Sequence, residues 1–243
     1  MFSIFKKKTE KAELCFKTDI HCHIVPGVDD GSPDVSTSVE LVERMKGWGI
    51  NRIIASPHVT QDTFENTPET IAPAFEMLKS ELDTRGVDIE LSHSAEYRLD
   101  EFFLTQLECR NIVPLPDNYL LVENPFFQES WDLDKTLFDL KVRGYKPILA
   151  HPERYFYYYG NKRTRYDELH NVGTLFQINL LSLAGYYGKD EKVIAEYLVE
   201  KGYVDFIGTD LHRHVHADAI DAYLASKDYR KIATKLHLLN DKI

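Results

Sequence analysis

The feature that most constrains the fold is a regular alternation of two kinds of segment along the chain. Short runs rich in apolar and β-branched residues alternate with segments whose apolar residues recur at helical spacing. Such alternation favours a parallel sheet, because each helix carries the chain back to the start of the next strand. We expect seven strands, at residues 14–23, 52–56, 87–94, 119–122, 147–150, 175–179 and 203–207.

No linker or shift in composition divides this series into separate domains. Seven or eight strand–helix units within 243 residues favour a closed or nearly closed barrel, with a doubly wound open sheet as the alternative. We expect a single domain over residues 19–243, preceded by a basic extension over residues 1–18. That extension could contact an anionic membrane surface, although a frayed basic tail is the preferred interpretation.

The composition narrows the possible classes of function. A net charge of −10 argues against a general nucleic-acid binder, which normally carries a strong basic surface. An anionic substrate stays possible, because bound metal ions can reverse the local field. Cys15, Cys22 and Cys109 form no CxxC pair, which fits a reducing compartment, and we expect a cytoplasmic protein. No apolar run approaches the roughly 18 residues that would span a bilayer.

Histidines and carboxylates stand at the C-terminal ends of six of the seven expected strands. In a barrel of parallel strands these ends meet at one face, where active sites are built. The alternative is an ordinary polar rim, since hydrophilic side chains naturally mark the exit of a strand. The residues concerned are His21, His23, His58, Glu96, Glu123, His151, Asp210 and His212, with Asp30 a short distance beyond the first strand.

Nine nitrogen and oxygen ligands exceed the coordination number of a single ion and suit two or three ions with bridging carboxylates. Their mixture fits Mn²⁺, Zn²⁺ or Fe²⁺ better than Ca²⁺, which prefers oxygen alone. Clusters of this kind activate water for attack at phosphorus. Arg154 lies three residues after His151, and its guanidinium matches phosphate oxygens, whereas the alternative is a surface ion pair with Glu153.

The complete set of motifs resembles the PHP (polymerase and histidinol phosphatase) superfamily. More narrowly, it is similar to the bacterial manganese-dependent protein-tyrosine phosphatases of capsule and exopolysaccharide loci. The likeness extends from Asp19 to His212, and its most specific pieces are Val-Asp-Asp-Gly at residues 28–31 and His-Pro-Glu-Arg at residues 151–154.

The resemblance implies a distorted (β/α)7 TIM-like barrel with a three-metal centre, most commonly of Mn²⁺, with Fe²⁺ or Zn²⁺ possible. Arg154 would bind and stabilise the transferring phosphoryl group. The substrate would be phosphotyrosine on a partner tyrosine kinase that controls polysaccharide export. The ligand sets would be His21, His23, Glu96 and Asp210 for one ion, Glu96, Glu123 and His151 for the second, and Asp30, His58 and His212 for the third.

One departure from the family pattern concerns the second phosphate-binding arginine. The family usually carries it in a loop after the last Asp-x-His, where this chain has Arg213-His214-Val215-His216. Arg213 is therefore the candidate for this substrate-binding role. Two other functions stay open: a small-molecule phosphatase such as a histidinol phosphatase, and a kinase-docking regulatory module in which catalysis is secondary.

Overall fold

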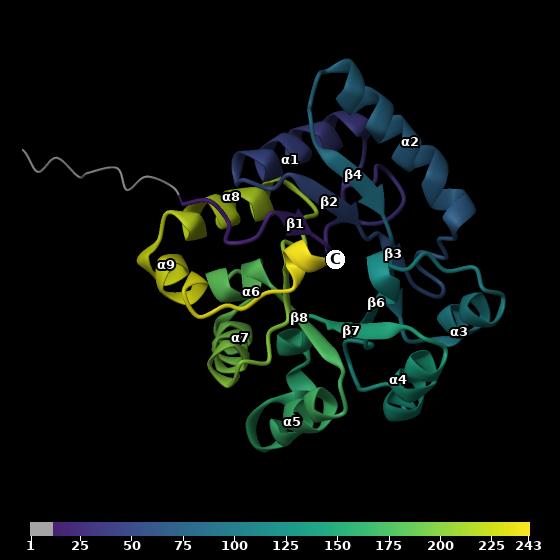
Figure 1. Cartoon of the computed structure of the whole chain (residues 1–243), viewed down its shortest axis with the longest axis vertical. Helices are drawn as coiled ribbons and strands as arrows, with labels where there is room; N and C mark the ends of the chain where they lie inside the picture. Colours follow the sequence, from purple (N-terminus) through teal and green to yellow (C-terminus); the bar gives the residue numbers. More distant parts are fainter. Residues whose placement is uncertain (1–11) are drawn as a thin grey trace, which may run out of the picture.

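The computed structural model describes residues 12–243 as parallel strands in a curled arrangement with helices on the outside (Figure 1). Two hydrogen-bonded groups of strands make up this arrangement, in the orders β1-β2-β4 and β3-β5-β6-β7-β8-β9. The strands are β1 (Thr18–Asp19), β2 (Arg52–Ala55), β3 (His58–Val59), β4 (Glu90–His93), β5 (Glu96–Arg98), β6 (Tyr119–Glu123), β7 (Lys146–Ala150), β8 (Leu175–Asn179) and β9 (Phe206–Gly208).

The helices pack their apolar stripes against the outer face of the strands. In α1, Val39, Val42 and Met45 are buried, and Asp34 caps the helix by accepting a hydrogen bond from the backbone N–H of Thr37. The helices are α1 (Val35–Gly47), α2 (Pro68–Thr84), α3 (Glu101–Glu108), α4 (Leu133–Val142), α5 (Thr164–Asn171), α6 (Leu180–Ala184), α7 (Lys189–Lys201), α8 (His214–Leu224) and α9 (Lys227–Ala233). Short 3-10 turns are η1 (Pro116–Asn118), η2 (Pro152–Arg154), η3 (Phe156–Tyr158), η4 (Gly160–Lys162) and η5 (Asn240–Lys242).

The strand expected at residues 203–207 is shorter and begins later, as β9. Three other expected strands differ from the observed ones because the chain changes hydrogen-bonding partner within them. The segment expected at residues 52–56 stops at Pro57 and resumes as β3, and the segment at 87–94 resumes as β5. This break places His58 directly opposite Glu96. In the segment at 14–23, only β1 pairs with β2; beyond it, Cys22 bridges to Leu211. The first and last strand segments of the chain therefore lie side by side.

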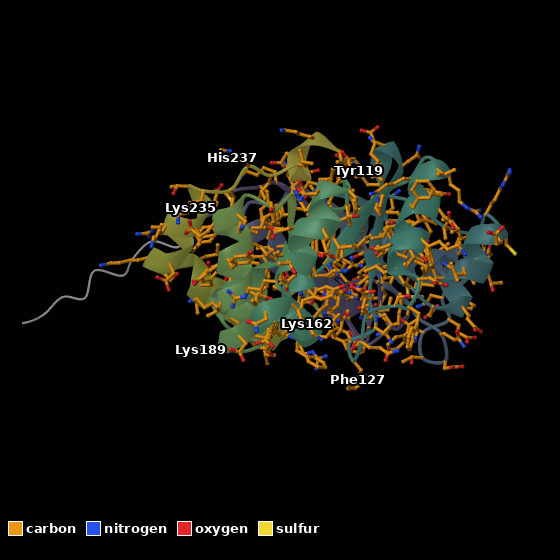
Figure 2. All side chains as sticks on the ribbon, turned by 90° about the horizontal axis from the view of Figure 1, so that it is seen from below. Tyr119, Phe127, Lys162, Lys189, Lys235 and His237 are labelled. Atoms are coloured by element: carbon orange, nitrogen blue, oxygen red, sulfur yellow. The ribbon has the colours of Figure 1, made fainter. Side chains whose placement is uncertain are left out.

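Strand periodicity separates an inner layer of side chains from an outer one. Along β6, Leu120 and Val122 belong to the larger core under the helices, whereas Leu121 packs inside with Ile148 and Phe206. Side chains two residues apart share a face, so the residue after this inner layer is Glu123. An apolar layer thus supports polar side chains at the C-terminal ends of the strands. Figure 2 shows the direction in which β6 runs across the molecule. Tyr119, at the start of β6, lies at one edge, and Phe127, beyond the end of β6, lies at the other.

The residues just before β1 pack against the rest of the chain. Leu14 and Phe16 are buried, and the backbone N–H of Ala12 donates to the carbonyl of Leu224. Residues 1–11 of the expected basic extension lie outside the described residues. Over residues 12–243, no helix combines the length and the apolar character needed to cross a membrane.

Candidate metal centre

His21 and His23, which follow β1, face two carboxylates at the C-terminal ends of the strands. The Nε2 atoms of the two rings lie 3.2 Å apart. Oε2 of Glu96 lies 3.3 Å from Nε2 of His21 and 3.5 Å from Nε2 of His23. Oδ1 of Asp210 lies 3.5 and 3.4 Å from the same two nitrogens. All four side chains are buried, and their donor atoms surround a single point.

Hydrogen bonds on the far side of the two imidazoles determine which ring nitrogen carries the proton. Nδ1 of His21 lies 2.7 Å from Oε1 of Gln177, and Nδ1 of His23 lies 2.8 Å from Oδ2 of Asp29. Both partner atoms are acceptors, so each neutral ring donates through Nδ1 and keeps a lone pair on Nε2. Two lone pairs facing each other beside two carboxylates repel, and a cation among them removes the repulsion.

A second group of donors forms on the other side of Glu96. Oε1 of Glu96 lies 2.9 Å from Nε2 of His151, and Oε2 of Glu123 lies 3.7 Å from the same nitrogen. Nδ1 of His58 also approaches this group, at 2.9 Å from Oε2 of Glu96 and 3.8 Å from Oε1 of Glu123. Glu96 therefore contacts both groups, which is the position that a bridging carboxylate occupies.

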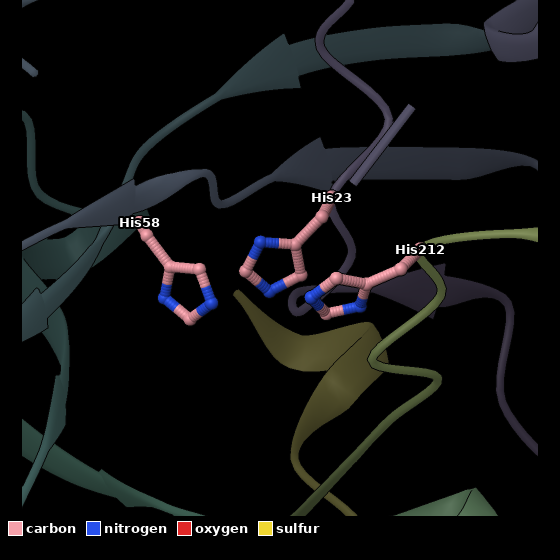
Figure 3. A group of neighbouring side chains, drawn as sticks. All are labelled: His23, His58 and His212. Atoms are coloured by element: carbon pink, nitrogen blue, oxygen red, sulfur yellow. The ribbon is translucent and has the colours of Figure 1, made fainter. Parts of the chain in front are cut away.

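A third group lies nearer the solvent. Oδ1 of Asp30 is 3.6 Å from Nε2 of His58 and 3.6 Å from Nε2 of His212. The rings of His23, His58 and His212 lie together, with the His23 and His212 centroids 3.9 Å apart (Figure 3). Nδ1 of His212 donates to the backbone carbonyl of Asp210 at 2.9 Å, which leaves Nε2 to face Asp30. The structure thus brings all nine sequence-predicted ligands into one connected cluster.

Four buried atoms of the predicted ligands have no hydrogen-bond partner among residues 12–243. They are Nδ1 of His58, Oε2 of Glu96, Oε2 of Glu123 and Nδ1 of His151. An unpaired buried polar atom costs about 1–3 kcal/mol, so a native site normally satisfies it. Coordination of divalent cations would satisfy Nδ1 of His58 and the two carboxylate oxygens, and these residues therefore fit a metal centre.

The electrostatics of the cluster favour positive charge. Burial alone would lower the pKa values of His21 and His58, but Glu96 and the neighbouring carboxylates raise them to about 9 and about 10. Burial would raise the pKa of Asp210, yet the nearby imidazole of His21 holds it well below its usual value. Burial, reinforced by the charge of Glu96, raises the pKa of Glu123 to about 7. The carboxylates thus create a field that stabilises a proton or a cation at this position.

Two proposed ligands adopt backbone conformations that side chains rarely populate. His151 has a φ of 34° and Asp210 a φ of 50°, both in the left-handed region. Such conformations cost of order 1–3 kcal/mol and persist where surrounding contacts enforce them, most often at functional sites. At Asp210 these contacts involve Oδ2, which accepts hydrogen bonds from Nδ2 of Asn179 at 2.6 Å and from the Tyr187 hydroxyl at 2.9 Å.

A cavity of about 370 Å³ opens beside the cluster. Arg154 lines it, with Nη1 3.2 Å from Oδ2 of Asp210 and its guanidinium between the rings of Phe126 and Tyr187. The alternative partner Glu153 is buried elsewhere and accepts hydrogen bonds from the backbone of Asn179 and from Ser182. Arg154 is therefore a cavity residue and not half of a surface ion pair. Arg213 also lines the cavity and is exposed.

Several side chains that support the cluster were not identified from the sequence. Gln177 and Asn179 occupy alternate positions of β8 that face inward. Polar residues at such positions of a buried strand could have been recognised in the sequence as candidates for the site. Asp29, next to the predicted ligand Asp30, orients His23 and accepts a hydrogen bond from the backbone N–H of His58. Arg98, two residues after Glu96, lines the cavity. Tyr187 lies in the loop between α6 and α7, and no local sequence pattern predicts that it contacts Asp210.

Gly208 lets β9 pass close to His21, and we expect its replacement by alanine to weaken metal binding. An added Cβ would lie 2.5 Å from Cβ of His21 and 2.9 Å from Nε2 of Gln177. The backbone that carries His21 would have to shift. We expect at least about 10-fold weaker Mn²⁺ binding, as for lost supporting contacts, and about 1–3 kcal/mol of lost stability, as for an overpacked core. Calorimetric metal titration and urea unfolding measure both.

The matched control for this variant is Gly47→Ala at the end of α1. No atom lies within 4 Å of its added Cβ, so metal affinity and stability should stay close to those of the parent protein. A Gly208→Ala protein that binds Mn²⁺ as tightly as Gly47→Ala would contradict the close approach inferred here.

Comparison with known proteins finds relatives over most of this chain. The family model for capsular polysaccharide synthesis proteins, CpsB/CapC, matches residues 17–240. Tyrosine-protein phosphatase YwqE of Bacillus subtilis (strain 168) is 33% identical over 195 residues, covering 80% of this chain and 76% of that protein. Tyrosine-protein phosphatase CpsB of Streptococcus pneumoniae is 30% identical over 202 residues, covering 80% and 82%.

A solved structure extends the likeness to three dimensions. It comes from crystal structures of YwqE from Bacillus subtilis and CpsB from Streptococcus pneumoniae, described as unique metal-dependent tyrosine phosphatases. It superposes with a TM-score of 0.72 at 29% identity and covers 89% of this chain and 91% of the other. The chain therefore belongs to the CpsB/CapC family of capsular polysaccharide synthesis proteins.

Proposed function

We propose that this chain is a metal-dependent protein-tyrosine phosphatase that hydrolyses phosphotyrosine on a partner kinase regulating capsular and exopolysaccharide synthesis and export in the cytoplasm. The relatives named tyrosine-protein phosphatases support the reaction. The observation that carries the proposal is the pair of Nε2 atoms of His21 and His23, which lie 3.2 Å apart and beside the buried carboxylates of Glu96 and Asp210. Arg154 adds a fixed cation at the adjoining cavity.

The proposed ligand sets follow the three groups of contacts. His21, His23, Glu96 and Asp210 hold one ion; Glu96, Glu123 and His151 hold the second; Asp30, His58 and His212 hold the third. We propose Mn²⁺ as the native metal, because mixed nitrogen and oxygen donors without thiolate suit it, as they also suit Fe²⁺ or Zn²⁺. When bound, such ions supply Lewis acidity towards phosphoryl oxygens and lower the pKa of a water molecule.

The residues of the chain orient the substrate and balance its charge. Arg154 donates to the phosphoryl oxygens, and the rings of Phe126 and Tyr187 restrict its guanidinium in position. The exposed Arg213 is the proposed second contact at the cavity. A tyrosyl leaving group has an ordinary pKa near 10, so it needs less assistance from a general acid than an alkoxide does. This difference favours aryl over alkyl phosphates in a site of this kind.

The proposed frame for this site is a distorted barrel of seven β/α units over residues 19–243, after a basic extension at residues 1–18. Two features support it. β2 with β3, and β4 with β5, each read as one strand with a two-residue interruption. The parallel bridge between Cys22 and Leu211 joins the first and last segments of the series.

The test is metal removal and reconstitution, followed on two substrates. Chelation should lower hydrolysis of a phosphotyrosine peptide by at least about 100-fold, since the ions contribute several kcal/mol of transition-state stabilisation. Mn²⁺ should restore it, and Fe²⁺ and Zn²⁺ are compared in parallel. A metal-free protein that keeps full activity would refute the proposal.

The same preparation decides between protein and small-molecule phosphatase. We expect kcat/KM on the phosphotyrosine peptide to exceed that on histidinol phosphate, because the leaving groups differ in basicity. A preference for histidinol phosphate would support the small-molecule function instead.

A further inference from the structure

Arg98 places another guanidinium at the cavity, beside a different carboxylate of the cluster from the one that Arg154 contacts. Arg154 contacts Oδ2 of Asp210, whereas Arg98 contacts Glu123, with Nε 3.2 Å from Oε1. Both arginines line the same cavity. A phosphoryl group bound in this cavity would therefore have both guanidinium groups among its neighbours.

The strand geometry explains why Arg98 points into this cavity. It lies two residues after Glu96 on β5, so the two side chains share a face of the strand. Tyr97 between them is buried in the core under the helices. In the register of β5 with β6, Arg98 stands directly opposite Glu123. The position is fixed by a strand and not by a loop.

The contacts of Arg98 leave most of its donors available. Among residues 12–243, its side chain has one partner, Glu123, which uses only Nε. Both Nη atoms, with four of the five N–H groups, remain for a ligand. The side chain is 29% exposed, so an anion can reach it from the cavity.

A neighbouring hydroxyl points to the same kind of ligand. Thr60 lines the cavity, is 2% exposed, and its Oγ1 has no hydrogen-bond partner among the described residues. A buried hydroxyl without a partner is costly unless a bound group accepts its proton. The wall that carries Thr60 and Arg98 therefore presents donors without acceptors, which is the pattern that an oxyanion requires.

We propose that Arg98 is a further phosphate-binding residue, whose Nη atoms donate to the non-bridging oxygens of the substrate's phosphoryl group. This inference rests on the proposed phosphatase function and identifies further recognition within the same site. It adds a residue held by a strand to the contacts proposed for Arg154 and Arg213.

The test is calorimetric titration of inorganic phosphate into the Mn²⁺-loaded protein, with metal content measured on the same sample. In Arg98→Met we expect unchanged metal content and about 10–100-fold weaker phosphate binding, as for loss of a charge-assisted pair. Arg98→Lys keeps the charge without the fork and should fall between the two. The matched control is Arg143→Met, which removes an exposed arginine paired with Glu108 away from this cavity, and it should bind phosphate within about 3-fold of the parent.

Each outcome has a defined meaning. Parental phosphate affinity in either Arg98 variant overturns the inference. If Arg98→Met loses metal, the residue acts by positioning Glu123, and the Lys variant then decides whether phosphate contact exists as well. If the parent protein binds phosphate through Arg98 but does not hydrolyse phosphotyrosine, the proposed function fails and this inference stands. If the parent protein hydrolyses phosphotyrosine while Arg98→Met binds phosphate normally, the proposed function stands and this inference fails.

Discussion

Glu96→Gln should abolish phosphatase activity, with kcat at least about 1,000-fold lower, because it removes the carboxylate that two of the three groups of the cluster share. Oε2 of Glu96 lies 2.9 Å from Nδ1 of His58 and 3.3 Å from Nε2 of His21, and Oε1 lies 2.9 Å from Nε2 of His151. Glutamine keeps the shape but replaces one ligand oxygen with an amide nitrogen that has no lone pair for a metal. The loss corresponds to about 4 kcal/mol of transition-state stabilisation.

The measurement pairs kcat on a phosphotyrosine peptide with metal content by mass spectrometry. We expect at least one ion fewer per chain in Glu96→Gln. Glu153→Gln is the matched control, because Glu153 is an equally buried carboxylate near the same strand ends that contacts no imidazole of the cluster. It should keep the parental metal content. Equal metal loss in both variants would mean that buried negative charge in general, and not bridging by Glu96, holds the ions.

The placement of the nine predicted ligands was accessible from the sequence because parallel strands deliver their C-terminal ends to one edge. Glu123, for example, directly follows the buried apolar residues of β6, so its side chain lies at that edge of the sheet. Helix α4 is a similar case, since its three buried leucines recur at helical spacing and so are visible in the sequence. These features depend on local periodicity and on one topological rule.

The breaks in the strands were not accessible in the same way. Pro57 lacks a backbone N–H and so indicates an interruption, but it does not say that the chain resumes as β3 with His58 opposite Glu96. The first segment also looked like one long strand. In the structure its pairing changes from β2 to the segment after β9, because the backbone N–H of Asp210 donates to His21 and that of His23 donates to Leu211. Long-range partners of this kind leave no local signature.

Of the polar residues that orient the predicted ligands, some could be predicted from the sequence and others could not. Arg98 and Gln177 could have been found, because each occupies an inward-facing position of a strand where an apolar residue would otherwise stand. Tyr187 could not, since it reaches Asp210 from a loop after α6 whose path depends on packing. The ends of the strands therefore indicate the predicted ligands but not all of the side chains that orient them.

Arg154→Met should lower kcat by about 100–1,000-fold while leaving the metal content intact, as for removal of one transition-state donor. The guanidinium lines the cavity beside the cluster, with its central carbon 4.2 Å from the ring centroid of Tyr187. Asp210 keeps two other donors on Oδ2, from Asn179 and Tyr187, so this ligand should stay oriented without Arg154. Arg154→Lys should recover less than about 10-fold, because an ammonium lacks both the fork and the stacking between rings.

Single-turnover rates on a phosphotyrosine peptide, with metal content determined in parallel, measure this effect apart from product release. The matched control is Arg165→Met, which breaks ion pairs of Arg165 with Glu129 and Asp134 away from the cavity. That variant should lose stability, and its kcat should stay near the parental value. Arg154→Met would be at odds with the proposed catalytic role if it kept more than half of the parental rate with full metal content. That result, together with intact binding of the kinase, would favour the docking-module function, because catalysis would then not depend on the guanidinium of Arg154 at the cavity.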